Sequence, residues 1–199
     1  MEKKMKKLLV ASALLLVMGS AQAADKVRWD SVSASYESLD LDGSKFTGFG
    51  VSGTKLLNEN VFITGSYSSL SDDMKVFGST IDLEVSTLSV GIGYRYELSS
   101  NTDVFGVMSR LDFTADASGF GTSSDTSGNG LGFEGGVRSL LNEQFELMGS
   151  ISYSDVDDDS EVGFGVKGIY HFDDKFSASL GYLSGDDADQ ISAAVIMFF

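Results

Sequence analysis

The chain has 199 residues, with 14 basic and 29 acidic side chains, a formal net charge of −15 and no cysteine. Such an acidic chain repels nucleic acid, and without cysteine it has neither disulfide bonds, nor a cysteine nucleophile, nor cysteine ligands for zinc. Hydrophobic residues make up 42% and aromatic residues 11% of the chain. These fractions and their regular spacing exclude a disordered chain.

Residues 1–23 have the three parts of a cleaved secretory signal peptide. Four lysines precede the apolar stretch 8–18, and the small-residue segment 19–23 ends in Ala-Gln-Ala. A positive head, an apolar middle and a small-residue cleavage site are typical of export signals. The apolar stretch is shorter than the roughly 20 residues that a transmembrane helix needs. We therefore expect a mature chain of residues 24–199 that forms a single domain.

Apolar and polar residues alternate along most of the mature chain. In segment 88–96, leucine, valine, isoleucine and tyrosine occupy every second position, and serine, glycine and Arg95 fill the positions between them. The same period recurs in 129–140, 144–154 and 161–172. A strand with lipid on one side and a lumen on the other has this pattern. A helix would not keep such residues on one face.

The pattern predicts an all-β fold, an antiparallel up-and-down transmembrane β-barrel with ten strands. The expected strands are 27–37, 45–55, 60–70, 80–96, 103–113, 129–140, 144–154, 161–172, 175–184 and 190–199. An even count places both chain ends in the periplasm, with short turns there and longer connections outside the cell. The Gly- and Ser-rich segment 119–130 falls in one of the outer connections, expected near 114–128. Eight strands are the alternative, if two weak segments such as 27–37 and 45–55 are not strands.

Two further sequence features bear on the strand register. The segment Leu56–Glu59 recurs as Leu140–Glu143, an offset of 84 residues that equals four strands, and both copies fall at expected periplasmic turns. The second copy places Arg138 opposite Glu146 on the inward face, where opposite charges stabilise a cross-strand pair. In segment 80–96 the alternation changes phase between Val85 and Leu88. This change indicates either a β-bulge or an extension of the strand above the membrane.

A secreted soluble β-sandwich or lipocalin-like barrel would also alternate. Here, however, the face opposite the apolar one consists mostly of serine, glycine and charged residues. Aromatic residues also gather at two levels near the strand ends, as the two interfaces of a membrane select. The membrane barrel is therefore the favoured interpretation.

The last expected strand ends the chain on an aromatic residue and carries one apolar face. That face consists of Ile191, Ala193, Val195, Met197 and Phe199. It resembles the C-terminal signature of bacterial outer-membrane proteins, which the barrel-assembly machinery recognises. The whole mature chain resembles small outer-membrane β-barrels, including OmpA-type barrel domains and small porin-like proteins, although OmpA-type barrels have eight strands. The resemblance implies a location in the bacterial outer membrane, in contact with lipid and lipopolysaccharide.

No residue pattern indicates catalysis or a cofactor, and no metal ligand set is expected. The expected outer loops are acidic and contain Asp40, Asp42, Asp72, Asp73, Asp155, Asp157, Asp158, Asp159, Asp186, Asp187 and Asp189. Such carboxylates suit Ca²⁺ or Mg²⁺, but their spacing matches no EF-hand loop, so solvated loops are favoured over the alternative that Ca²⁺ orders the 155–160 loop.

Small outer-membrane barrel enzymes resemble one another in placing a histidine near the outer rim. The single histidine, His171, instead lies two residues before the expected periplasmic turn at Asp173. A lone inward histidine is more often structural, so we predict that the protein is not an enzyme.

Two functions remain open from the sequence. The first, which the sequence favours, is a narrow porin-like diffusion channel, because a ten-stranded barrel is wider than one filled by its own side chains. The second is a closed structural or surface-interaction barrel that acts through its acidic outer loops, in adhesion, envelope integrity or resistance to host factors. The expected lumen-facing charges are Arg95, Arg110, Glu134, Arg138, Glu146 and Lys167. They would set ion preference in a channel and pair across the lumen in a closed barrel. A continuous water path past Glu134 and Arg138 distinguishes the two.

Overall fold

The computed structural model describes residues 26–41, 44–76, 79–119, 122–156, 159–185 and 188–199. These residues form ten antiparallel strands in one closed barrel, in which each strand pairs with its sequence neighbours and β1 pairs with β10. The strands are β1 Ser31–Leu41, β2 Ser44–Leu56, β3 Val61–Val76, β4 Ser79–Ser99, β5 Thr102–Gly119, β6 Thr122–Leu140, β7 Phe145–Val156, β8 Asp159–His171, β9 Phe176–Ser184 and β10 Ala188–Phe198. The prediction of an all-β barrel with ten strands is confirmed. The expected signal peptide, residues 1–23, lies outside the described residues and stays a prediction.

Short turns close the end of the barrel at which the described chain begins and ends, which we call the periplasmic end. In three of these turns, one side-chain oxygen accepts two backbone N–H groups. Asn58 accepts from residues 60 and 61, Asn142 from 144 and 145, and Asp173 from 175 and 176, over distances of 2.7–2.9 Å. Asparagine and aspartate favour such turns because they hydrogen-bond their own backbone. The repeated Leu-Leu-Asn-Glu segments thus encode two copies of one turn.

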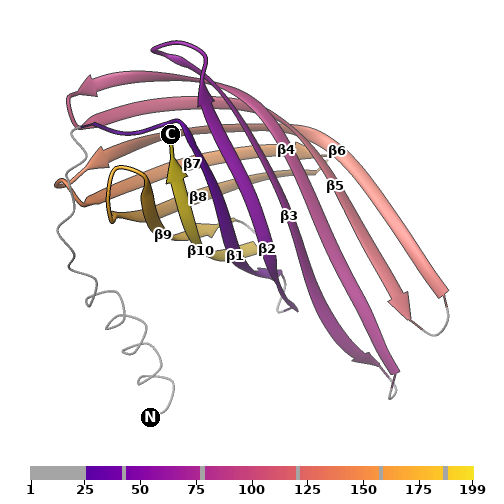
Figure 1. The fold of residues 1–199 in the computed structure, drawn as a ribbon. Coiled ribbons are helices and arrows are strands. Elements are labelled where there is room, and N and C mark those ends of the chain that lie inside the picture. Colours follow the sequence, from indigo (N-terminus) through magenta and orange to yellow (C-terminus); the bar gives the residue numbers. More distant parts are fainter. Residues whose placement is uncertain (1–25, 42–43, 77–78, 120–121, 157–158, 186–187) are drawn as a thin grey trace.

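Strands β3–β6 are longer than the others, with 16 to 21 residues against 9 to 13. Figure 1 shows these four strands projecting beyond the rest of the barrel at the end away from the C-terminus. We call residues 71–76, 79–88, 112–119 and 122–129 the wall. The segment expected as an outer loop near 114–128 is largely strand, because residues 113–119 pair in register with 122–128. That expectation is wrong: glycine and serine here continue a long hairpin.

The wall explains the change of phase in β4. Pairing of β4 with β3 runs without a register shift through residues 79–94, so no β-bulge lies between Val85 and Leu88. Instead the two faces exchange polarity along one continuous strand. On the inward face, Leu83 and Val85 in the wall replace the polar type of residue seen at Ser89. On the outward face, Asp82 and Glu84 are exposed. The outward face therefore becomes polar in the wall, as water rather than lipid requires.

The membrane-facing surface lies at the level of the shorter strands. Its outward side chains are apolar and exposed, including Tyr36, Phe49, Val90, Ile92, Tyr94, Phe133, Ile151, Phe164 and Val195. The described residues contain no helix long and apolar enough to span a membrane.

Candidate functional site

An aromatic floor closes the lumen near the periplasmic end. The segment 26–30, part of which was expected to be strand, instead lies before β1 and places Val27 and Trp29 in the barrel, each 6% exposed. They form one buried cluster with Phe62 and Leu140, and the half-buried Phe105 packs against it. The Trp29 ring lies 4.6 Å from that of Phe62 and 5.6 Å from that of Phe105, between centroids. We call these five side chains the floor.

Two strand glycines make room for the floor. A Cβ atom on Gly93 would clash with the ring of Phe62, and one on Gly136 would lie 2.7 Å from the ring of Phe105. Both distances are below those that real Cβ atoms adopt, so larger residues would displace the rings. Glycine in a strand is typical of such close approach.

A first ion pair fixes the orientation of Trp29. Its indole N–H donates to the Asp103 carboxylate at 2.7 Å, and Arg95 donates to the same oxygen at 2.7 Å. Asp103 is 2% exposed. Because a buried carboxylate needs hydrogen-bond partners, this pairing both satisfies Asp103 and holds the indole across the lumen.

A second ion pair contacts the ring of Trp29. Arg138 donates to Glu146 at 2.6 Å, and the Arg138 guanidinium lies 4.6 Å from the centre of the Trp29 ring. The other Glu146 oxygen is 3.3 Å from His171 Nε2. Glu146 is 2% and His171 1% exposed. In the register Glu146 stands opposite Leu140 and Arg138 opposite Met148, so the expected pair does form, but diagonally across two positions.

Arg28 ties the N-terminal segment to this network. Its guanidinium lies 2.8 Å from His171 Nδ1, 3.2 Å from the carbonyl of Asp173 and 4.4 Å from the Phe198 ring, and it also donates to the carbonyl of Asp174. Since arginine only donates, His171 Nδ1 accepts, and the imidazole proton lies on Nε2, toward Glu146. Burial lowers the pKa of Arg28, while the nearby carboxylates of Asp174 and Glu146 act in the opposite direction.

Above the floor, the lumen holds three cavities of about 240, 280 and 310 Å³. The 280 Å³ cavity is bounded by Trp29, Phe62 and Phe105 and extends past Glu134 and Arg138. Serine hydroxyls line these cavities from several strands, namely Ser31, Ser33, Ser35, Ser52, Ser66, Ser68, Ser89, Ser109, Ser150, Ser179 and Ser192. The interior is therefore a hydroxyl-lined space above a buried aromatic and ionic layer.

Five of the six expected lumen charges face the interior. Arg95, Arg138 and Glu146 belong to the ion pairs at the floor, and Glu134 and Lys167 line the cavities above it.

Arg110 is the exception, and its expected position is wrong. Its register partners, Val90 and Leu131, are exposed on the outward face, and its own side chain is 62% exposed beside Asp112 at 2.9 Å. Inward positions in β5 are odd-numbered, from Asp103 to Ser109. An outward charge is tolerated here because it lies near the outer end of the membrane-facing strands and is paired.

Sequence reasoning missed Arg28, Trp29 and Asp103. Residues 27–30 were assigned to a strand, and in a strand Trp29 would have been one more alternating residue. One sequence feature could have indicated a special role for Trp29: it is the single tryptophan of the chain and lies within the first residues after the expected cleavage site.

The expected acidic loop residues can be placed only in part. Asp42, Asp157, Asp158, Asp186 and Asp187 lie outside the described residues. Among those that the structure describes, no group of three or more histidine, cysteine or acidic side chains is arranged to hold a metal ion.

The C-terminal face lies where the alternation placed it. The side chains of Ile191, Val195, Met197 and Phe199 are 41–63% exposed on the outward surface of the barrel, and Ala193 shares their face. Recognition of this face during assembly stays a prediction.

Comparison with known proteins gives a family and a set of similar folds. A model of the family described as "Outer membrane protein beta-barrel domain" matches residues 9–161. No curated protein matches the chain in sequence. Among solved structures, Ail of Yersinia pestis, in complex with the heparin analogue sucrose octasulfate, is 16% identical over 85% of this chain and 95% of its own, with a TM-score of 0.47.

Two further structures have similar folds. The KdgM porin, in complex with disordered oligogalacturonate, is 10% identical over 85% of this chain and 99% of its own, with a TM-score of 0.50. OprG of Pseudomonas aeruginosa is 12% identical over 88% of this chain and 99% of its own, with a TM-score of 0.46. At these identities the similarity concerns the fold alone.

Proposed function

Since the chain belongs to the outer membrane protein β-barrel family, and its place is the bacterial outer membrane, we propose that it is a surface-interaction barrel, closed at its periplasmic end. The observation that carries this proposal is the layer formed by the floor and its two ion pairs. Trp29, Phe62, Asp103, Glu146 and His171 are each at most 6% exposed. A water path between the cavities and the periplasm would have to pass through this layer, and its members are joined by hydrogen bonds and ring contacts.

The part of the molecule available to partners is then the outer end. The wall presents polar and acidic side chains on its outward face, including Asp82, Glu84, Asp116 and Asp125, all exposed. Carboxylates there favour positively charged partners through long-range attraction. The described residues of the wall are also paired strands, and a surface that is ordered before binding loses less conformational entropy than an irregular loop does.

A non-enzymatic role forms part of the same proposal. It is supported by the position of His171, whose ring nitrogens contact Arg28, Ser177 and Glu146. A histidine held in this way within a buried network at the periplasmic end acts as a structural connector between β8 and the N-terminal segment.

A diffusion channel is the second candidate, and the three serine-lined cavities favour it. Small polar side chains leave room for water, and opening the floor would connect these cavities to the periplasm. The two proposals therefore differ in one property, namely whether the floor is closed or open to the periplasm when the protein is in the membrane.

Conductance in a planar bilayer tests the state of the floor. The refolded protein, verified by its heat-shifted gel mobility, is expected to insert without discrete conductance steps. The variant Trp29→Ala with Phe62→Ala removes the centre of the floor and is expected to produce such steps. Tyr94→Ala, which removes an outward aromatic side chain of 55% exposure, is the matched control and is expected to stay silent. Reproducible steps from the unaltered protein would refute the closed barrel and establish the channel.

A further inference from the structure

Lys167 occupies a central position in the lumen. It is the only side chain that lines all three described cavities. Its methylene chain crosses Gly181 of the neighbouring strand. A Cβ atom added at Gly181 would lie 3.5 Å from the Cε atom of Lys167. Among the residues that the structure describes, Lys167 has no hydrogen-bond or ion-pair partner. This distinguishes it from Arg95 and Arg138, which are both engaged by carboxylates.

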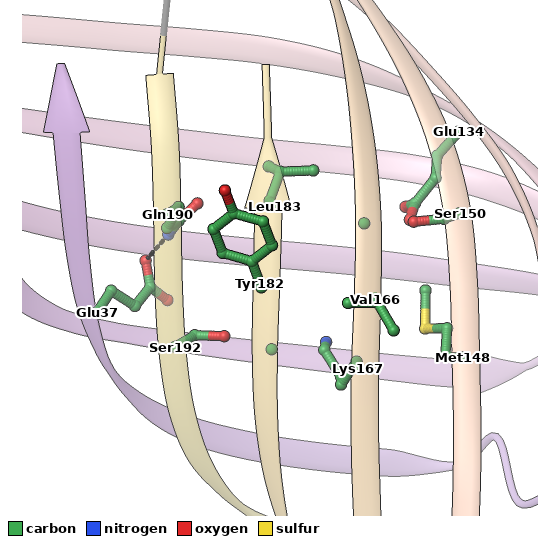
Figure 2. Close-up of a pocket in the computed structure, with 12 residues that line it drawn as sticks. Glu37, Glu134, Met148, Ser150, Val166, Lys167, Tyr182, Leu183, Gln190 and Ser192 are labelled. Atoms are coloured by element: carbon green, nitrogen blue, oxygen red, sulfur yellow. Dashed lines mark hydrogen bonds between the residues drawn. The ribbon is translucent and has the colours of Figure 1, made fainter. Parts of the chain in front are cut away.

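Two carboxylates share the cavities with Lys167. Glu134 lines two of them, and no described residue is hydrogen-bonded or ion-paired to its side chain. Glu37 lines the 240 and 310 Å³ cavities, the first of which it shares with Glu134, and it accepts hydrogen bonds from Ser35 at 2.6 Å and from Gln190 at 2.8 Å. Figure 2 shows Lys167 between them, with Glu37 and Gln190 on one side and Glu134 on the other. Lys167 and Glu134 attract each other electrostatically across the cavity, but no hydrogen bond or close ion pair joins them in the part of the chain that the structure describes.

These two groups define the chemistry of a ligand. An ammonium and a carboxylate that face a cavity without protein partners depend on solvent for their hydrogen bonds. A solute that displaces this solvent must supply an acceptor to Lys167 and a donor to Glu134. Charge-assisted hydrogen bonds of this kind are the strong ones, and surrounding serine hydroxyls can donate or accept as needed.

We propose that the lumen above the floor binds a small zwitterion, with its anionic group at Lys167 and its ammonium group at Glu134. A simple anion bound at Lys167 would place its negative charge near that of Glu134 and give Glu134 no partner. A simple cation bound at Glu134 would likewise place its positive charge near that of Lys167 and give Lys167 no partner. Both are therefore disfavoured relative to a molecule that carries the two charges together. The inference rests on the proposed function in one respect: a closed floor makes the site a pocket entered from outside the cell.

Trp29 supplies a direct readout of binding. It is the only tryptophan in the chain, and it lines the same 280 Å³ cavity as Glu134 and Lys167. A molecule bound there changes the surroundings of the indole ring and hence its fluorescence. The refolded barrel is titrated with 4-aminobutyrate, a zwitterion, and with butyrate and butylammonium, which each retain one of its two charges. Isothermal calorimetry of the same titrations gives a second measurement.

A saturable response to 4-aminobutyrate is expected, with butyrate and butylammonium binding at least about tenfold more weakly. Lys167→Met and Glu134→Gln each remove one charged hydrogen bond and are expected to weaken binding by about tenfold to a hundredfold. Lys45→Met, which alters an exposed lysine at the outer end of β2, is the matched control and is expected to bind as the unaltered protein does. Heat-shifted mobility verifies that each variant is folded.

Three results would overturn the site: no saturable signal in either measurement, equal affinity for the singly charged solutes, or unchanged affinity in Lys167→Met. These results are independent of the conductance experiment. If the unaltered barrel conducts and 4-aminobutyrate still binds in a manner that depends on Lys167, only the closed floor fails.

Discussion

Glu146 is the residue whose replacement tests the ionic layer most directly. Its carboxylate is 2% exposed and accepts from Arg138 at 2.6 Å, with His171 Nε2 at 3.3 Å from its second oxygen. The change Glu146→Gln keeps the size of the side chain and removes its charge. The amide oxygen can still accept from Arg138. The amide nitrogen, however, only donates, and it would face the Nε2–H of His171.

The histidine cannot resolve this conflict by moving its proton. A proton on Nδ1 would face the Arg28 guanidinium at 2.8 Å, and that group only donates. The variant therefore leaves a donor facing a donor in a buried site, and it leaves Arg138 without its counter-ion. Removal of one partner from a buried ion pair costs about 3 to 5 kcal/mol, because the remaining charge is left uncompensated. About 3 kcal/mol corresponds to a change of roughly a hundredfold in the folding equilibrium constant.

Urea unfolding of the barrel in lipid vesicles, followed by Trp29 fluorescence, measures this loss. Glu146→Gln is expected to lower the free energy of unfolding by about 3 kcal/mol or more. Glu143→Gln is the matched control, since Glu143 lies three residues away in the exposed turn, and its effect is expected to stay within about 0.5 kcal/mol. A loss below about 1 kcal/mol for Glu146→Gln would show that water relieves the pair and would refute a dry ionic layer.

Two further predictions concern the floor and the turns. Gly93→Ala places a Cβ against the Phe62 ring and is expected to cost about 1 to 3 kcal/mol in urea unfolding. Gly149→Ala, with no atom within 4 Å of the new Cβ, is the control, and equal effects of the two would refute the packing of Phe62 on Gly93. Hydrogen bonding from the Phe176 N–H is the main cause that holds the pKa of Asp173 below its ordinary value of 3.8. This contribution to stability is present above that value and is lost as the pH falls through the lowered pKa of the folded state. Asp173→Asn keeps the acceptor oxygen, so Tm should fall less between about pH 5 and pH 2 than in the unaltered protein; an identical fall in both would contradict the role of the carboxylate.

Much of the candidate site could be predicted from the sequence because the alternation of apolar and polar residues is a local property. Strand residues point to opposite faces with a period of two, so the inward positions of Glu134, Glu146 and Lys167 follow from their neighbours alone. Arg110 shows the limit of this reasoning. Its environment is set by pairing with Val90 and Leu131, and the assumption that a charge faces the lumen fails where an outward charge has a partner near the membrane surface.

By itself, the sequence determined the fold class, the ten strands, the periplasmic turns and the outward face of the last strand. These follow from period-two alternation and turn-forming residues, which act over a few positions of the chain. Only the tertiary structure decided that the lumen has a floor. Trp29 contacts Phe62, Asp103 and Arg138, and Arg28 contacts His171, across 33 to 143 positions of the chain. Such contacts arise when the sheet closes on itself, and no local pattern specifies which side chains then meet at its centre.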